Sequence, residues 1–123
     1  MLFRSVYLHG WVEKTELARI FTSSRLLVLP SENENFGNVV AEALSFGVPC
    51  VVSKFVGISD IVAKYKAGEV IDDLSPSSIA DGVIKVLQGN ENNYRFSALN
   101  AAQLSFDWQK IANKWKDLIV SLN

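Results

Sequence analysis

The stretch that most constrains this chain runs from Pro30 to Pro49 and reads PSENENFGNVVAEALSFGVP. It contains a polar turn, a Phe-Gly step, a short apolar helix and a Gly-x-Pro exit. Glu34 and Glu42 stand eight positions apart, with Gly37 between them. The first carboxylate precedes a helix N-terminus and the second lies one turn inside the helix. They can be neighbours only if the chain turns sharply at Gly37. Such a pair suits a polyhydroxylated, phosphorylated ligand.

Short apolar runs alternate with helical segments on both sides of this stretch. Strands are expected at Ser5 to Leu8, Leu26 to Leu29, Pro49 to Ser53 and Gly68 to Ile71. Helices are expected at Lys14 to Thr22, Asn38 to Phe46 and Ser59 to Tyr65. Because helices of about ten residues separate the strands, the strands should pair in parallel through right-handed crossovers. The sequence therefore predicts an α/β fold, a Rossmann-like doubly wound parallel sheet of about four strands flanked by helices. The continuous apolar run at Leu26 to Leu29 further predicts a strand buried on both faces.

The last third of the chain is predicted to be helical. One helix should start near Pro76 and end at Gln88-Gly89, burying Ile79, Val83, Val86 and Leu87. A second should span about Asn92 to Leu104, and a third should begin at Asp107 as N-cap, with Phe106 packing on Ile111. The third helix carries an apolar stripe of Trp108, Ile111, Ala112, Trp115, Leu118, Ile119 and Leu122. Core packing is the simpler interpretation of this stripe, and docking on another domain is the alternative.

Composition narrows the class of protein. A length of 123 residues predicts a single domain over 1–123, with βα units in 1–75 and helices in 76–123. The net charge of −1 disfavours nucleic-acid binding. Cys50 is the only cysteine, which predicts an inert core thiol and a reducing compartment. Because the N-terminal apolar run is too short for a signal peptide, we expect a cytoplasmic protein. His9 is the only histidine, so no Cys/His cluster for a metal is expected, and without a G-x-G-x-x-G motif no cofactor is expected.

The carboxyl ends of parallel strands are where ligands gather, and the polar turn before the second helix lies at such an end. The N–H groups of Gly37, Asn38 and Val39 would face an anion there, favoured by the helix dipole. Glu34 could accept hydrogen bonds from a ligand hydroxyl. Glu42, among apolar helix residues, would need a donor that ribose or sugar hydroxyls could supply. Alternatively, Glu34 caps the helix and Glu42 is a solvated residue on its outer face. Spacing alone leaves both interpretations open.

The whole string from Pro30 to Pro49 resembles the E-x7-E segment of the retaining glycosyltransferases of family 4, also called group 1. Their pattern reads roughly P-S-x-x-E-x-F-G-x-x-x-x-E-A-x-x-x-G-x-P-V. Every position of the pattern is met here except the closing Val, where Cys50 stands with Val51 next. The similarity extends to the Val6 to Val12 segment, and to the aromatic start of the last helix at Phe106, Trp108 and Ile111.

This resemblance implies the C-terminal, nucleotide-sugar-binding domain of a GT-B enzyme that transfers a hexosyl group to a glycan or lipid-linked acceptor. The donor would be a UDP-, GDP- or ADP-sugar, and the pathway polysaccharide biosynthesis. Glu34 would be the catalytic residue, contacting donor-sugar hydroxyls, and Glu42 would contact the ribose. The implied donor-binding residues are Phe36, Gly37, Asn38, Glu42, His9, Gly10 and Trp11, the last three near the nucleobase. Because the family retains configuration by front-face attack without a metal, neither glutamate would be a nucleophile; both would orient the donor and stabilise developing charge.

Two departures from the family pattern shape the expectations. The usual Gly-Gly-x-x-Glu is replaced by Val56-Gly57-Ile58-Ser59-Asp60. The family's basic pair, which holds the leaving diphosphate, and its N-terminal acceptor domain lie upstream of this segment, so the isolated chain should transfer no sugar. The central strand pair is missing too, which would open a sheet edge and allow a homodimer. The full-length enzyme would lie in the cytoplasm, peripheral to the inner face of the membrane. The alternative function is a non-catalytic Rossmann-like binding or assembly module.

Overall fold

The parallel sheet predicted from the sequence is present in the computed structural model, which describes residues 6–106 and 108–122. Its strands, in spatial order, are β1 (Leu27–Leu29), β2 (Cys50–Ser53) and β3 (Gly68–Ile71). Both pairs are parallel, with Leu27 opposite Cys50 and Cys50 opposite Gly68. The helices are α1 (Lys14–Ser23), α2 (Asn38–Ser45), α3 (Ser59–Tyr65), α4 (Pro76–Gln88), α5 (Glu91–Ser105) and α6 (Trp108–Ser121). Strand and helix order therefore follow the prediction from β1 onward.

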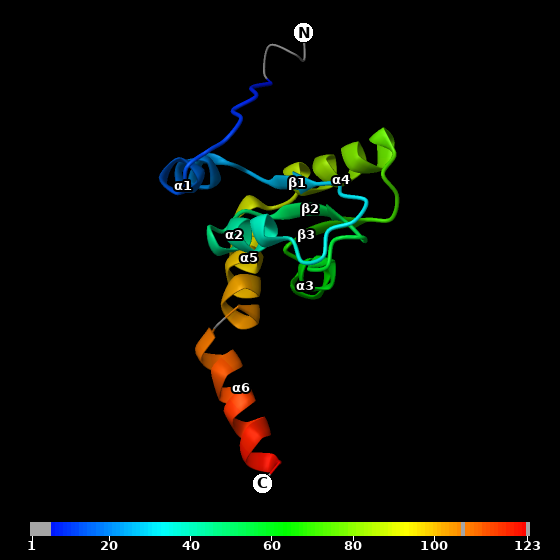
Figure 1. Ribbon diagram of the computed structural model, residues 1–123. Coiled ribbons are helices and arrows are strands. Elements are labelled where there is room, and N and C mark those ends of the chain that lie inside the picture. Colours follow the sequence, from blue (N-terminus) through cyan, green and yellow to red (C-terminus); the bar gives the residue numbers. More distant parts are fainter. Residues whose placement is uncertain (1–5, 107, 123) are drawn as a thin grey trace.

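Helices cover both faces of the sheet, so the doubly wound arrangement is confirmed (Figure 1). The strand β2 lies at the centre and all four of its residues are buried. Its side chains alternate between faces, as they must in a pleated strand. Cys50 and Val52 join the larger core cluster, to which α2, α3 and α5 contribute. Val51 joins Ile71 and Val86 in a second cluster beneath α4.

The strand β1 is less buried than its sequence predicts. Among the described residues it pairs only with β2, so it forms an edge of the sheet. Val28 is 37% exposed, although both faces of this strand were expected to be buried. The reason is the position of α4, whose main contacts with the sheet are with β3 and β2 and not with β1.

The strand expected at residues 5–8 is not found. Ser5 lies outside the described residues, and residues 6–8 form no strand in the structure. Leu8 is 96% exposed, and the segment runs apart from β1 before entering α1 (Figure 1). A strand is stable only where its N–H and C=O groups pair with a neighbour, and in the described structure this segment pairs with no strand, although β1 has a free edge. The described sheet thus has three strands rather than about four.

The helices α4 and α5 begin within one residue of the predicted positions. Ser75 is the N-cap of α4, accepting a hydrogen bond from the Ser78 N–H, with Pro76 in the first turn. Of the expected buried face, Val86 is buried and Ile79 and Val83 are partly buried, but Leu87 is exposed. Three buried alanines of α5, Ala98, Ala101 and Ala102, allow it to pack closely on α2 and α3.

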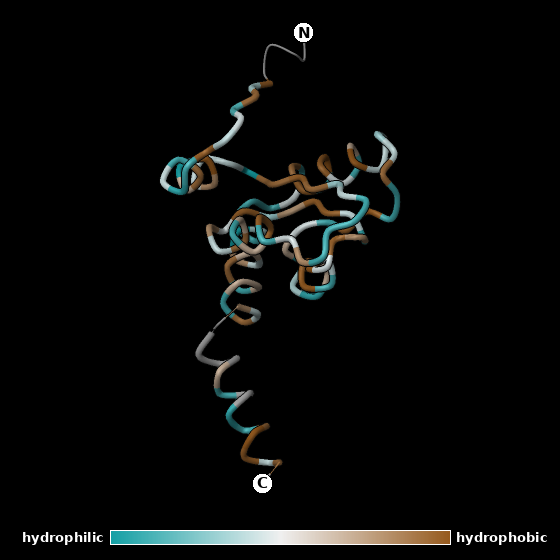
Figure 2. The backbone as a smooth tube through the Cα atoms, viewed as in Figure 1, coloured by the Kyte–Doolittle hydropathy of each residue, from teal (hydrophilic) through white to brown (hydrophobic). Residues whose placement is uncertain are grey.

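The helix α6 extends away from the sheet, and its C-terminal end is hydrophobic (Figures 1 and 2). Ala112, Leu118, Ile119 and Leu122 are exposed, and Leu122 is 78% exposed. Core packing is therefore the wrong interpretation for these members of the stripe. The other members, the side chains of Trp108, Ile111 and Trp115, lie outside the described residues, as does the expected N-cap Asp107. Within the described residues, no helix has the length and apolar character needed to cross a membrane.

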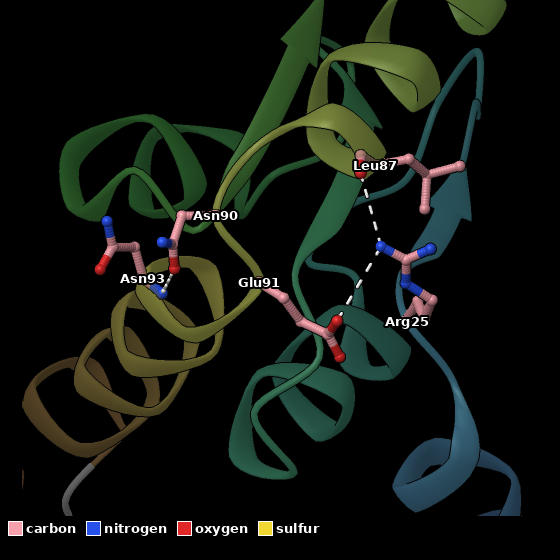
Figure 3. A network of polar contacts seen from close by, with 5 residues as sticks. All are labelled: Arg25, Leu87, Asn90, Glu91 and Asn93. Carbon is pink, nitrogen blue, oxygen red and sulfur yellow. Dashed lines mark hydrogen bonds and ion pairs between the residues drawn. The ribbon is translucent and has the colours of Figure 1, made fainter.

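Polar contacts of Arg25, which lies just before β1, reach the end of α4 and the start of α5 (Figure 3). The Arg25 guanidinium donates to the Leu87 carbonyl at 3.4 Å and lies 3.9 Å from the Glu91 carboxylate. Asn90 caps α5 by accepting a hydrogen bond from the Asn93 N–H at 3.0 Å. Because Arg25 and Glu91 are both largely exposed, the ion pair contributes little to stability. The network is structural.

The lone cysteine gives a direct test of the packing. Cys50 is fully buried, and burial raises the pKa of its thiol to about 12. Because the thiolate is the reactive form, we expect native protein at pH 8 to resist a thiol-specific disulfide reagent and unfolded protein to react at once. Labelling with and without denaturant measures this. Native labelling at the denatured rate would contradict the packing of β2.

Candidate functional site

Two loops lie together at the carboxyl edge of the sheet. The motif loop, residues 30–37, connects β1 to α2, and the support loop, residues 54–58, connects β2 to α3. Figure 1 shows them running side by side beyond the strands they follow. In a parallel α/β sheet this is the edge where ligands bind.

Backbone hydrogen bonds join the two loops in the manner of paired β-strands. The Glu34 N–H donates to the Phe55 carbonyl at 3.3 Å, and the Gly57 N–H donates to the Glu34 carbonyl at 2.8 Å. The Ile58 N–H then donates to the Phe36 carbonyl at 3.0 Å. Glu34 is also bridged to Val56 in parallel register. The backbone that carries Glu34 is thus held by the support loop.

Two glycines permit this close approach. Gly37 has a φ of 97°, which confirms the sharp turn predicted there, and a Cβ on it would lie 2.9 Å from a methyl carbon of Val56. A Cβ on Gly57 would lie 1.9 Å from the Asn35 carbonyl oxygen. In sequence, Gly57 is the one glycine that remains where the family pattern has Gly-Gly-x-x-Glu. In the structure, Gly57 allows the two loops to contact each other. No local sequence pattern predicts this contact.

The N-terminus of α2 opens beside the motif loop without a side-chain cap. The N–H groups of Val40 and Ala41 donate to the Gly37 carbonyl, whereas those of Asn38 and Val39 have no backbone acceptor in the described part of the chain. The Glu34 carboxylate accepts no hydrogen bond from any described residue, so it does not cap the helix. The free N–H groups and the helix dipole together favour an anion here.

Glu42 lies on the outer face of α2 and is exposed. Val40, Ala43 and Leu44 are the buried residues of this helix, and a residue at position 42 points away from them. The apolar surroundings expected for Glu42 are therefore wrong, and the alternative of a solvated outer face describes its position. The carboxylate is free to contact a ligand from solvent.

An open groove runs between α2 and α5 and includes part of the motif. Phe36, Asn38 and Glu42 line one side of it, and Leu99, Ala102 and Phe106 line the other. The Phe36 ring, 44% exposed, meets the Phe106 ring edge-on at a centroid distance of 6.0 Å. The structure thus brings together Phe36, Asn38 and Glu42, while Glu34 lies outside the groove lining. Phe106 was expected to pack on Ile111, and its place beside the motif was not predicted.

The N-terminal candidates lie elsewhere in the described structure. His9, Gly10 and Trp11 are exposed residues of the segment before α1, with Trp11 94% exposed. A Cβ on Gly10 would meet no atom within 4 Å. Figure 1 shows this segment well separated from the motif loop. Their assignment to a nucleobase stays a prediction.

One cation begins the support loop. The Lys54 ammonium lies 5.4 Å from the centroid of the Phe55 ring. Lys54 also attracts Asp73 in the loop after β3, whose pKa is lowered chiefly by hydrogen bonds from Ser75 and Ser78. In the described part of the chain, no three His, Cys, Asp or Glu side chains gather closely enough to hold a metal ion.

Comparison with known proteins shows what this chain is similar to. The model of the family described as "Glycosyl transferases group 1" matches residues 2–102. A D-inositol 3-phosphate glycosyltransferase of Nocardioides sp. is 33% identical over 109 residues, which cover 87% of this chain and 24% of that protein. A sulfoquinovosyl transferase of Arabidopsis thaliana is 35% identical over 77 residues, covering 63% of this chain and 15% of that protein. The chain thus spans about a quarter or less of the length of these curated relatives.

Solved structures agree on the fold. A sucrose-phosphate synthase from Thermosynechococcus elongatus superposes with a TM-score of 0.80 and 24% identity, covering 98% of this chain and 31% of that chain. WaaG, a glycosyltransferase involved in lipopolysaccharide biosynthesis, superposes with a TM-score of 0.62 and 22% identity, covering 76% of this chain and 25% of that one. At these identities the likeness concerns the fold alone.

Proposed function

This chain belongs to the group 1 glycosyl transferases, and from that membership we propose that it forms the donor-binding part of a retaining glycosyltransferase. Its fold is the Rossmann-like domain of the GT-B arrangement. The donor is a nucleotide-diphospho-sugar, and the parent enzyme moves a hexosyl group to a glycan or lipid-linked acceptor in polysaccharide synthesis. Residues 1–123 form one partial nucleotide-sugar-binding domain within it.

The observation that carries this proposal is the junction between the motif loop and α2. There, a helix N-terminus with unpaired N–H groups at Asn38 and Val39 follows directly on a loop that bears a half-buried, unpaired carboxylate, Glu34. Backbone N–H groups at a helix N-terminus bind phosphate, and carboxylates accept hydrogen bonds from hydroxyls. A ligand that contains both a diphosphate and a sugar fits this pairing.

Each residue then has a stated role. The amides of residues 36–38 approach the sugar and the diphosphate, Glu34 contacts the sugar hydroxyls, and Glu42 contacts the ribose hydroxyls from the outer face of α2. In front-face attack the acceptor oxygen enters on the side from which the diphosphate leaves. Positive charge develops on the sugar ring as the bond to the diphosphate breaks. Glu34 lowers the barrier by orienting the donor and stabilising that charge. Neither glutamate forms a covalent bond with the sugar.

The proposed site needs parts from beyond this chain. A basic pair that neutralises the leaving diphosphate and a domain that binds the acceptor would come from the rest of a longer enzyme. The isolated chain is therefore proposed to bind the donor without transferring sugar. The unpaired edge of β1 would be covered by further strands of that enzyme or by a second copy of this chain. A cytoplasmic location, peripheral to the membrane, belongs to the same proposal.

Calorimetric titration of the chain with UDP-, GDP- and ADP-sugars tests the proposal. We expect one class of donor to bind with micromolar affinity, and Glu42→Ala to weaken that binding by about tenfold or more, as loss of hydrogen bonds to a charged group does. The control is Asp81→Ala, which removes an exposed carboxylate from α4 on the other face of the sheet. It should bind as the wild type does. Failure of all three donors to bind would favour the alternative, a non-catalytic binding or assembly module.

A further inference from the structure

A buried serine lies beneath the motif loop and has no part in the proposed donor contacts. Ser53 is the last residue of β2 and is fully buried. Its hydroxyl donates to the carbonyl of Ser31, 22 positions earlier in the chain, at 2.5 Å. Ser31 is the second residue of the motif loop. A buried hydroxyl with one defined partner is specific, because removal of either group leaves the other unpaired in the interior.

This hydrogen bond fixes the start of the motif loop, and the support loop fixes its end. At the far end, the carbonyls of Glu34 and Phe36 accept from the N–H groups of Gly57 and Ile58. The anchors at both ends thus come from one continuous segment that leaves the central strand. Between them the Glu34 carboxylate bonds no described residue, so its position depends on the backbone that carries it.

We propose that Ser53 is a positioning residue of the donor site. Its hydroxyl holds the motif loop against the end of β2, and through that loop it sets where Glu34 and the first amides of α2 meet a donor. This inference rests on the proposed function and assigns to that site a residue that touches no ligand. The competing explanation is that Ser53 only stabilises the core.

A second serine of the same region separates the two explanations. Ser59 is also buried, and its hydroxyl donates to the Lys54 carbonyl at 3.5 Å, a bond that stays within the segment after β2. Ser59→Ala therefore makes the same chemical change close by without releasing the motif loop. If Ser53 only stabilised the core, Ser53→Ala would leave donor affinity as little changed as Ser59→Ala does.

The test compares Ser53→Ala with Ser59→Ala in the full chain. For Ser53→Ala we expect about a tenfold loss of affinity for whichever UDP-, GDP- or ADP-sugar binds the wild type, and less than about a twofold loss for Ser59→Ala. Amide hydrogen exchange adds a readout that needs no ligand. The amides of Glu34 and Gly57, which join the loops, should exchange faster in Ser53→Ala, while those of Val51 and Val52 in the central strand keep their protection.

Ser53→Cys provides a second variant should the smaller side chain disturb the fold. The thiol fills the space of the hydroxyl but is a weak donor, so we expect the same loss of loop protection and affinity. Equal effects of Ser53→Ala and Ser59→Ala, or wild-type exchange at Glu34 and Gly57 in both Ser53 variants, would overturn the positioning role. If the wild type binds no donor, the proposed function fails, and the exchange data alone decide whether Ser53 holds the loop.

Discussion

Gly68→Ala is expected to destabilise the domain by about 3 kcal/mol or more, a large part of the 5–15 kcal/mol that holds a typical domain together. Gly68 begins β3 with a φ of 148°, a conformation that side-chain-bearing residues rarely adopt. A Cβ there would lie 1.7 Å from the carbonyl oxygen of Cys50. That oxygen belongs to the buried central strand, so neither partner can move without opening the β2–β3 pairing.

Urea unfolding followed by circular dichroism measures this effect. Gly10→Ala is the matched control, because Gly10 also has a positive φ, 65°, yet a Cβ on it would meet no atom within 4 Å. Gly10→Ala should therefore lose only the stability that a side chain costs at positive φ, about 1 kcal/mol. If Gly68→Ala lost no more stability than Gly10→Ala, the close contact between β3 and Cys50 would be disproved.

Gly57→Ala is expected to separate the two loops and abolish donor binding while the sheet stays folded. Its Cβ would lie 1.9 Å from the Asn35 carbonyl oxygen. Unlike Cys50, Asn35 lies in an exposed loop, so the motif loop can move away. Doing so breaks the hydrogen bonds that Gly57 and Ile58 donate to it. At about 1 kcal/mol for each bond, we expect a loss of about 2 kcal/mol in stability.

Unfolding and donor titration on the same sample test this separation of effects. The control is Gly82→Ala in α4, where a new Cβ would press on side chains of Val51 and Ile71 across the sheet from the loops. Whatever that variant does to stability, its donor affinity should equal that of the wild type. Wild-type donor affinity in Gly57→Ala would contradict the proposed role of the loop pairing.

Local sequence patterns correctly predicted those helices and strands whose bounds depend on residues within the element or next to it. The strand β3 and the helix α3 have the predicted bounds, and β2 begins one residue after the expected Pro49. The helix α2 ends one residue earlier than expected and is followed by Gly47 with a φ of 75°. In each case an apolar run or a helical period is bounded by glycine, proline or a capping residue, and these signals act over a few positions.

The predictions that failed concern what packs against a residue in the folded chain. An apolar run at residues 6–8 is a strand only beside a partner, and the burial of Val28 depends on how far α4 reaches across the sheet. In sequence, the exposed residues Ala112, Leu118, Ile119 and Leu122 of α6 were indistinguishable from residues that face a core. Burial is a property of what packs against a residue, and hydrophobic periodicity does not encode the partner.

The candidate site divides in the same way. Its chemical groups can be read from residues close together in the chain: two carboxylates, a glycine turn and a helix start lie within the twenty residues from Pro30 to Pro49. Its geometry is visible only in the folded chain: Glu42 faces solvent, Phe36 contacts Phe106, and residues 53–58 hold the loop that carries Glu34. These contacts could not be predicted because their partners are far apart in the chain, as Ser31 and Ser53 are at 22 positions. Contacts such as Ser53 to Ser31 form only once the parallel strands have paired, and no local pattern specifies them.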